Sequence, residues 1–311
     1  MNMITNKLLR TITAAAMAGA MLAGCSGGAV SSAPTAPTAP SAPSEVKSFD
    51  LAHEISVVSR EPGSGTRGAF IELFKVQEKT ADGTKTDRTS DEATVVSKTD
   101  IMLQTVAGDP WSIGYVSLGS LNDSVKAVSI DGVAPSSEAM LSGTYKISRP
   151  FNIATKGAPQ GLAKDFIDFV LSAEGQAVVA KSYVPINSGA PAYSGTKPAG
   201  KIVIGGSSSV YPAMEKLVEA YALVNPNAKT ELQSSDSTAG MSGTAEGIFD
   251  IGMASRDLSD TEKETLTPVS IAIDGIAVIV NPENPTAELT SAAVKGIFVG
   301  ETVKWSDISS K

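Results

Sequence analysis

Short β-branched runs alternate along the chain with longer segments whose apolar residues recur at helical spacing. The runs lie at residues 57–58, 113–116, 127–130, 203–204, 251–254 and 276–280. β-branched residues favour strands, and strands that alternate with helices are typical of layered α/β folds. The pattern therefore predicts an α/β fold class for the body of the chain.

Two segments show the helical period most clearly. One runs from Leu162 to Val179, and the other runs from Tyr211 to Val224. Residues spaced three and four positions apart share one face of a helix. Each segment is therefore predicted to form one amphipathic helix. The apolar stripe of the second consists of Met214, Leu217, Val218, Tyr221 and Val224.

One local pattern occurs three times: a strand-like run ends in small hydroxyl and glycine residues, and a helical segment follows. The small-residue loops are Gly63–Thr66, Gly205–Ser209 and Ser234–Ser237. Backbone N–H groups at the N-terminus of a helix stabilise an anion. One such loop is more often an ordinary helix cap, but three together indicate a site for a small anion.

The candidate ligands are the polar residues in and beside these loops. Arg60 ends the strand before the first loop, where a guanidinium can clamp two oxygens of a tetrahedral anion. Ser237 is the expected N-cap of the third helix, and Ser255 follows the strand over 250–254. The other candidate donors are Ser64, Gly65, Thr66, Ser208 and Ser209.

The first residues are typical of a bacterial lipoprotein. A basic start and an apolar stretch over 12–22 precede Leu22-Ala23-Gly24-Cys25, which resembles a lipobox. Residues 1–25 are therefore predicted to be a signal peptide and lipobox, with lipidation of Cys25. Residues 26–50 are rich in Pro and Ala and are predicted to be a tether. The expected location is the extracytoplasmic face of the bacterial membrane, with a lipid anchor.

Composition argues against several classes of function. The formal net charge of −8 and the 5% aromatic content disfavour a nucleic-acid partner. The single histidine, His53, and the absence of a G-x-S-x-G sequence disfavour a hydrolase triad. With one His and one Cys there is no zinc site of N and S ligands. We expect a binding protein rather than an enzyme, without a metal or cofactor.

Several segments together resemble the phosphate-binding lipoproteins of ABC transporters. The resemblance covers nearly everything from about 54 to 308, and it is specific because the motifs occur in combination. The motifs are Val57 to Arg67, Ile113-Gly114-Tyr115-Val116, Ser148-Arg149-Pro150-Phe151, Gly206 to Pro212, Ser237-Thr238-Ala239-Gly240, Asp250 to Arg256 and Asp274 to Pro282.

The resemblance implies a two-lobed, type II periplasmic-binding-protein-like fold with a hinged cleft. Lobe A would combine 51–150 with 271–308, and lobe B would span 151–270. The two sequence halves stand in the opposite order to that of the family, so the chain is predicted to be circularly permuted. The linker 188–200 would join the halves, either within a monomer or in a half-swapped dimer.

The resemblance also implies a ligand and a partner. Arg60, Ser64, Gly65 and Thr66 match one wall of the family's phosphate site, and Ser208, Ser209 and Ser237 match the other. The implied function is capture of inorganic phosphate for an ABC permease.

One departure from the family bears on selectivity. Some family members have an Asp where this chain has Ser255, and that Asp accepts the proton of hydrogen phosphate. Arg256 either adds attraction for the anion or pairs with Asp257 or Glu262. Three alternatives stay open: another tetrahedral oxyanion such as sulfate, a non-transport phosphate sensor or adhesion module, and, with the poorest fit, a secreted phosphatase.

Overall fold

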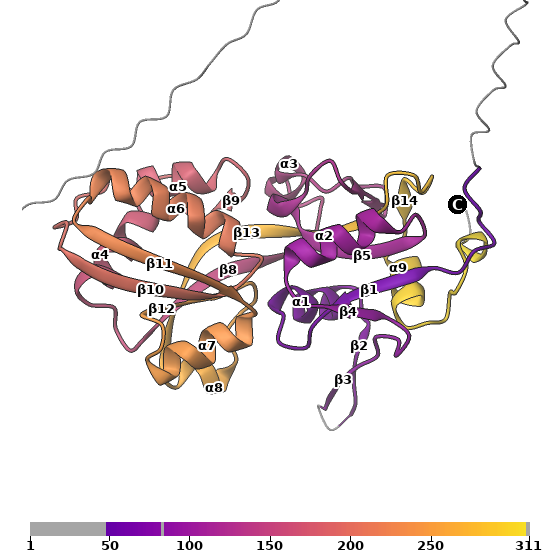
Figure 1. Ribbon diagram of the computed structural model, residues 1–311, viewed down its shortest axis with the longest axis horizontal. Coiled ribbons are helices and arrows are strands. Elements are labelled where there is room, and N and C mark those ends of the chain that lie inside the picture. The colour runs from indigo at the N-terminus through magenta and orange to yellow at the C-terminus, as the bar shows by residue number, and fades with distance from the viewer. Residues whose placement is uncertain (1–47, 82–83, 309–311) are drawn as a thin grey trace, which may run out of the picture. The chain divides into compact units, whose positions relative to one another are not determined.

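The computed structural model describes residues 48–81 and 84–308 (Figure 1). Its largest sheet is mixed and has the strand order β11-β10-β12-β8-β13-β5-β1-β4, with β6 and β9 paired to β13. The strands of this sheet are β1 (Ser56–Arg60), β4 (Thr94–Val96), β5 (Ser112–Ser117), β6 (Lys126–Ala127), β8 (Ser148–Lys156), β9 (Val184–Pro185), β10 (Gly200–Ser207), β11 (Ala228–Ser235), β12 (Ile251–Ala254) and β13 (Leu266–Val280).

Helices connect the strands, as the alternating pattern predicts. They are α1 (Gly65–Leu73), α2 (Thr99–Gly108), α3 (Ser137–Leu141), α4 (Gly161–Val170), α5 (Ala173–Val179), α6 (Tyr211–Val224), α7 (Ser237–Glu246), α8 (Asp260–Lys263) and α9 (Ser291–Phe298), with 3₁₀ turns η1 (Leu118–Ser120) and η2 (Trp305–Asp307). Small two-stranded sheets pair β2 (Gln77–Lys79) with β3 (Lys85–Asp87) and β7 (Ser129–Ile130) with β14 (Glu288–Leu289).

The long strand β13 links two halves of the sheet (Figure 1). Its first part, Leu266 to Gly275, pairs antiparallel with β8, and its last part, Ile276 to Val280, pairs antiparallel with β5. In one half, β10 lies parallel to both β11 and β12. In the other half, β1 lies parallel to both β4 and β5. Parallel pairs need crossover connections, which α1, α2, α6 and α7 supply.

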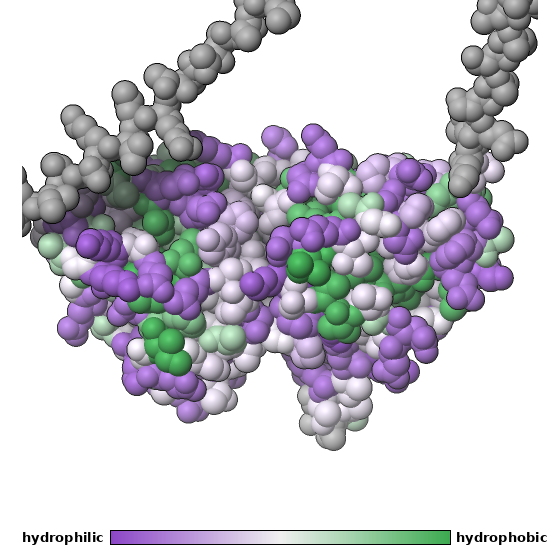
Figure 2. Space-filling model, in the orientation of Figure 1, coloured by the Kyte–Doolittle hydropathy of each residue, from purple (hydrophilic) through white to green (hydrophobic). Residues whose placement is uncertain are grey.

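Each half has its own apolar core. The core around β10 contains Phe166, Tyr221 and Ile204. The core around β5 contains Phe70, Tyr115 and Phe298. The predicted two-lobed α/β fold is therefore confirmed, whereas the lobe boundaries 51–150 with 271–308 and 151–270 stay a prediction. On the face that Figure 2 shows, hydrophilic residues spread over both halves, and hydrophobic residues lie in separate patches among them.

Of the two predicted helices, one is confirmed and the other is divided. The helix from Tyr211 to Val224 is confirmed with those bounds as α6. The prediction of one helix from Leu162 to Val179 is wrong, because the segment divides into α4 and α5. Ser172 stands between them: its hydroxyl donates to the Phe169 carbonyl at 2.7 Å and accepts from the Gly175 amide at 3.3 Å. A hydroxyl that caps a new helix interrupts the preceding one.

The predicted strand over 127–130 is also divided. Its first residue belongs to β6, which pairs with β13, and its end is β7, which pairs with β14. Within the described residues, no helix has the length and apolar character needed to cross a membrane. Cys25 and the segments 1–25 and 26–47 lie outside the described residues.

The linker follows an irregular path, since residues 188–199 contain no helix or strand. Asp165 of α4 anchors it, because its carboxylate accepts from the Tyr193 hydroxyl and from the amides of Thr196 and Lys197 at 2.8 and 3.2 Å. The Tyr221 hydroxyl of α6 donates to the same carboxylate at 2.6 Å. The linker is thus fixed to the half that contains α4 and α6.

The first and last described segments of the body lie side by side. The Ile55 amide donates to the Val303 carbonyl at 2.8 Å, and the Ser306 amide donates to the Leu51 carbonyl at 2.8 Å. The Trp305 indole adds a hydrogen bond to the Trp111 carbonyl at 3.1 Å. Residues near 51–55 and 303–306 therefore form a single structural unit.

Candidate anion-binding site

The first loop of the threefold pattern begins a helix as predicted. Arg60 is the last residue of β1, and Ser64 is the N-cap of α1, where its hydroxyl accepts from the Arg67 amide at 3.3 Å. Gly65 and Thr66 open the helix and are buried. The hydroxyl of Thr66 is therefore not the capping group and is free to contact other elements.

The serine hydroxyls of the second loop do not cap the helix that follows them. Ser208 and Ser209 follow β10, and Val210 occupies the N-cap position of α6 without any side-chain cap. Their hydroxyls instead contact the other half of the molecule, Ser208 through Arg60 and Ser209 through Thr66. Both are nearly completely buried.

The third loop corrects one prediction. Asp236, not Ser237, is the N-cap of α7, and its carboxylate accepts from the Ala239 amide at 2.8 Å. Asp236 has the extended backbone of an N-cap, whereas Ser237 is already helical. The Ser237 hydroxyl instead accepts from the Ser255 amide at 3.1 Å. The shift by one residue directs Ser237 toward the other candidate residues.

The predicted residues come together where the two halves meet. The Arg60 Nη2 donates to Ser208 Oγ at 3.1 Å, and the hydroxyls of Thr66 and Ser209 lie 2.8 Å apart. Thr66 also lies 3.3 Å from Ser255 Oγ, which lies 3.4 Å from Ser237 Oγ. We call this group of residues the hydroxyl cluster; its members are Arg60, Gly65, Thr66, Ser208, Ser209, Ser237 and Ser255. The predicted site residue Ser64 is not brought into it, because its hydroxyl caps α1.

Gly65 allows the close approach of the two halves. A Cβ atom at this position would lie 2.5 Å from Ser237 Oγ and 2.8 Å from Ser255 Oγ. Such contacts are too short for any side chain. The backbone at the start of α1 can therefore reach the cluster only because residue 65 is a glycine.

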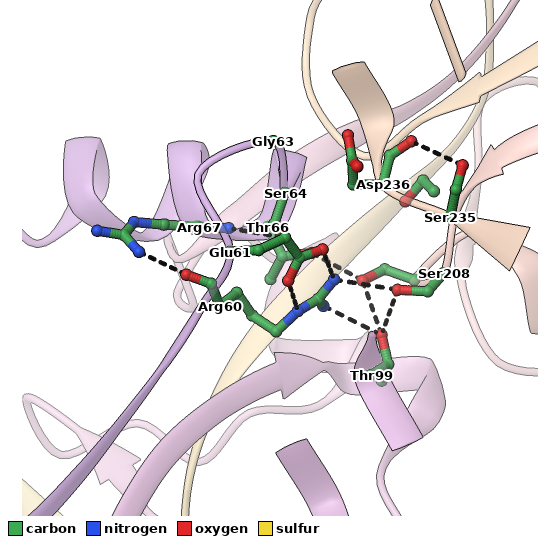
Figure 3. A network of polar contacts seen from close by, with 12 residues as sticks. Arg60, Glu61, Gly63, Ser64, Thr66, Arg67, Thr99, Ser208, Ser235 and Asp236 are labelled. Atoms are coloured by element: carbon green, nitrogen blue, oxygen red, sulfur yellow. Dashed lines mark hydrogen bonds and ion pairs between the residues drawn. The ribbon is translucent and has the colours of Figure 1, made fainter. Parts of the chain in front are cut away.

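Arg60 carries a neutralising partner. Its Nε and Nη2 donate to the two carboxylate oxygens of Glu61, both at 2.7 Å (Figure 3). The Arg60 side chain is 3% exposed and the Glu61 side chain 20% exposed, so the guanidinium is buried and its partner lies at the edge of the cluster. A bidentate pair fixes the orientation of the guanidinium. Arg60 is thereby held in position toward Ser208.

Thr99 and Arg149, which were not predicted as site residues, also contact the cluster. Thr99, the first residue of α2, lies 3.1 Å from Ser209 Oγ and accepts from Arg60 Nη1 at 3.3 Å. A hydroxyl residue before the apolar positions of a helix was a usable signal for Thr99. Arg149 of β8 donates to Thr66 Oγ1 at 3.0 Å. Arg149 belongs to the motif Ser148-Arg149-Pro150-Phe151 of the family resemblance, which did not assign it to the site.

Arg256 takes the second of the two roles considered for it. Its two terminal nitrogens each donate to one oxygen of the Glu262 carboxylate at 2.8 Å. Burial raises the pKa of Glu262, but the hydrogen bond and charge of Arg256 outweigh that effect and the net pKa is lowered. Arg256 thus forms an ion pair outside the hydroxyl cluster.

The surroundings match the chemistry of a small oxyanion. A cavity of about 530 Å³ opens beside the cluster, lined among others by Thr99, Ser208 and Tyr211. Hydroxyls, a guanidinium and helix N-termini are all donors to an anion. Among the described residues, no group of three or more His, Cys, Asp or Glu side chains is placed to hold a metal ion.

Comparison with known proteins places this geometry in a family. A family model described as a PBP superfamily domain matches residues 47–174 and 191–311. The "Phosphate-binding protein PstS 2" of Streptococcus agalactiae serotype V is 53% identical over 258 residues, which cover 82% of this chain and 88% of that protein. The "Phosphate-binding protein PstS 2" of Streptococcus pneumoniae serotype 4 is 41% identical over 255 residues, with 82% and 87% covered.

A solved structure agrees with these relatives. The crystal structure of a phosphate-binding protein of a phosphate ABC transporter from Streptococcus pneumoniae TIGR4 matches with a TM-score of 0.65 and 41% identity. The match covers 82% of this chain and 100% of that chain. The chain therefore belongs to the PBP superfamily and, within it, to the family of PstS-type phosphate-binding proteins.

Proposed function

We propose that this protein binds inorganic phosphate at the hydroxyl cluster and delivers it to an ABC permease. The observation that carries the proposal is the convergence of Arg60, Thr66 and Ser208 with the other candidate residues across the two halves. The names of the relatives support phosphate over the other oxyanions and describe binding proteins, not enzymes.

Binding of this kind needs no chemical step. The buried hydroxyls, the backbone amides at the start of α1 and the guanidinium replace the hydration shell of the anion. Residues from both halves contribute, so closure of the two halves around the anion completes the site and excludes water. Because the Glu61 carboxylate balances the charge of Arg60, binding relies on the hydrogen-bond donors rather than on a net positive charge.

The cellular setting is a proposal from the sequence. Lipidation of Cys25 would anchor the protein on the extracytoplasmic face of the membrane, and residues 26–50 would act as a tether. The segment like a lipobox supports this, since Cys25 is the single cysteine of the chain. Mass spectrometry of the protein from membranes tests it: the expected result is a diacylglyceryl Cys25 peptide, and an unmodified Cys25 would contradict it.

We also propose that the order of the halves is permuted relative to other members of the family; the two PstS 2 relatives match this chain over single spans of 258 and 255 residues and share its order. Two observations support it. Residues near Val303 hydrogen-bond with residues near Ile55, where the family's chain would continue from one to the other. Residues 188–199 are irregular and anchored by Asp165, as expected for a segment that joins two former chain ends. Lobe A is then 51–150 with 271–308, and lobe B is 151–270.

Calorimetric titration with inorganic phosphate tests the function. We expect saturable binding with a dissociation constant well below about 1 mM. A constant weaker than that would contradict the proposal. Parallel titrations with sulfate separate phosphate binding from general oxyanion binding, and co-purification with the permease separates transport from a sensor or adhesion role.

A further inference from the structure

A second guanidinium reaches the hydroxyl cluster from the strands that link the two halves. Arg149 on β8 stands opposite Asp274 on β13 in the antiparallel register. Its Nη1 donates to the Asp274 carboxylate and, at 3.0 Å, to the Gly275 carbonyl. Its Nη2 donates to Thr66 Oγ1 at 3.0 Å. One side chain thus connects the linking strands to the cluster.

The pair is deeply buried. Arg149 is 5% exposed and Asp274 is fully buried. Burial raises the pKa of Asp274, and the adjacent charge of Arg149 opposes that rise. A buried ion pair is weak support for stability, because desolvation offsets most of the attraction between the charges. A contribution to stability is therefore not enough to explain why Arg149 and Asp274 are paired here, and a role of the pair in the site would account for it.

One N–H donor of the Arg149 guanidinium has no hydrogen-bond partner among the described residues. This donor is the buried Nε atom. In an arginine fork, Nε–H and one Nη2–H point the same way. The edge that touches Thr66 therefore has an unpaired donor, and a buried unpaired donor is costly. An acceptor on that edge, such as an oxygen of a bound anion, would remove this cost.

The contact takes up one of the two acceptor lone pairs of the Thr66 hydroxyl. A guanidinium only donates, so Thr66 Oγ1 accepts from Arg149. The one proton of the hydroxyl is then available for an acceptor elsewhere. Arg60 has the same relation to Ser208 Oγ. Both guanidinium groups thus leave hydroxyls as donors, which suits a ligand rich in acceptors.

We propose that Arg149, held by Asp274, is a positioning residue of the phosphate site that sets Thr66 as a hydrogen-bond donor to the bound anion. The inference rests on the proposed function, because it assigns a residue to that same site. Arg149 acts chiefly through Thr66, to which its Nη2 donates.

The first test removes both charges of the pair. The Arg149→Gln/Asp274→Asn variant leaves no unpaired buried charge, and replacement of both partners is usually tolerated. We expect a cooperative thermal transition and phosphate affinity weakened about tenfold or more. The matched control is Arg88→Gln, which removes an exposed ion pair with Glu78 and leaves affinity unchanged. Unchanged affinity in the double variant would overturn the inference.

The second test keeps the ion pair. Arg149→Lys retains a cation beside Asp274 but removes the fork, so it decides the question even where the double variant does not fold. We expect the same loss of phosphate affinity, and an affinity within about twofold of the unsubstituted protein would overturn the inference. The expected loss separates a positioning role from a purely electrostatic one.

The third test asks whether Arg149 acts through Thr66. In a double-mutant cycle with Thr66→Val, the effect of Arg149→Lys should largely disappear. Additive losses would overturn the proposed route. Failure of the unsubstituted protein to bind phosphate would overturn the proposed function itself, whereas normal binding with unaffected Arg149 variants overturns this inference alone.

Discussion

The hydroxyl of Thr66 lies 2.8 Å from that of Ser209, although the two residues are 143 positions apart in the chain. Thr66 opens α1 after β1, and Ser209 precedes α6 after β10. Each is therefore at the carboxyl end of a strand in its own half. The cluster forms where the two halves meet, so the proposed anion binding there would be coupled to closure of the halves.

Replacement of Gly65 by alanine tests the close approach at the cluster. The added Cβ would lie 2.5 Å from Ser237 Oγ and 2.8 Å from Ser255 Oγ, so these residues must shift from their places in the cluster. We expect Gly65→Ala to weaken phosphate binding by about tenfold or more in calorimetry, with secondary structure retained. The matched control is Gly68→Ala in the same helix, because a Cβ there meets nothing within 4 Å.

Gly68→Ala should leave affinity unchanged and stabilise α1 by up to about 1 kcal/mol. Equal affinity in the Gly65 and Gly68 variants would show that the anion does not bind beside the start of α1.

Arg60 and Arg256 provide a matched pair of arginines. Arg60 contacts Ser208, whereas Arg256 is paired with Glu262 away from the cluster. Hydrogen bonds to charged groups contribute about 1.5–3 kcal/mol, so Arg60→Gln should weaken phosphate binding by about tenfold or more. Arg256→Gln should change the dissociation constant by less than about twofold. A larger loss for Arg256 than for Arg60 would contradict the assignment of the site.

The carboxylate of Asp165 should make stability depend on pH. Burial by itself raises the pKa of Asp165, but hydrogen bonds from Tyr193, Tyr221 and two backbone amides outweigh it, so the net pKa lies below the ordinary 3.8. A lowered pKa in the folded state gives stability that is present above the unfolded pKa and lost as pH falls through the folded one.

Asp165→Asn should therefore cost about 1–3 kcal/mol in urea unfolding at pH 7, and the difference should shrink below about pH 4. The control is Asp168→Asn on the same helix, whose exposed ion pair with Lys164 should contribute less than about 1 kcal/mol. A cost for Asp165→Asn that stays constant down to pH 3 would refute the role of its ionisation.

Closure of the two halves within one chain predicts a monomer. The linker and the contact between Ile55 and Val303 are both formed inside a single chain. We expect light scattering of the Cys25→Ser variant, which lacks the proposed lipidation site, to give the mass of one chain at micromolar concentration. A stable dimer that exchanges halves would contradict intrachain closure and favour the half-swapped arrangement.

Much of the fold could be predicted from local patterns in the sequence. The apolar stripe of α6 and the strand-loop-helix pattern are local features, and both predicted elements that the structure contains. The division between α4 and α5 was missed because Ser172 interrupts the helix by capping, which an apolar period does not reveal. The same limit applies to Asp236, which displaced Ser237 from the N-cap.

The site was less predictable than the fold because it depends on contacts between distant segments. Loop chemistry selected Thr66 and Ser208 as donors, but only the sheet brings them together. Thr99 follows the same helix-start rule and was recoverable. Arg149 was named in a motif of the family resemblance, but its contact with the site was not predictable because that contact depends on the register between β8 and β13.

A crystal structure with inorganic phosphate tests the central claim most directly. The account predicts one phosphate between the two halves, with its oxygens within hydrogen-bond distance of Arg60, Thr66 and Ser208. Phosphate bound elsewhere on the protein, with the hydroxyl cluster closed on itself as before, would contradict it.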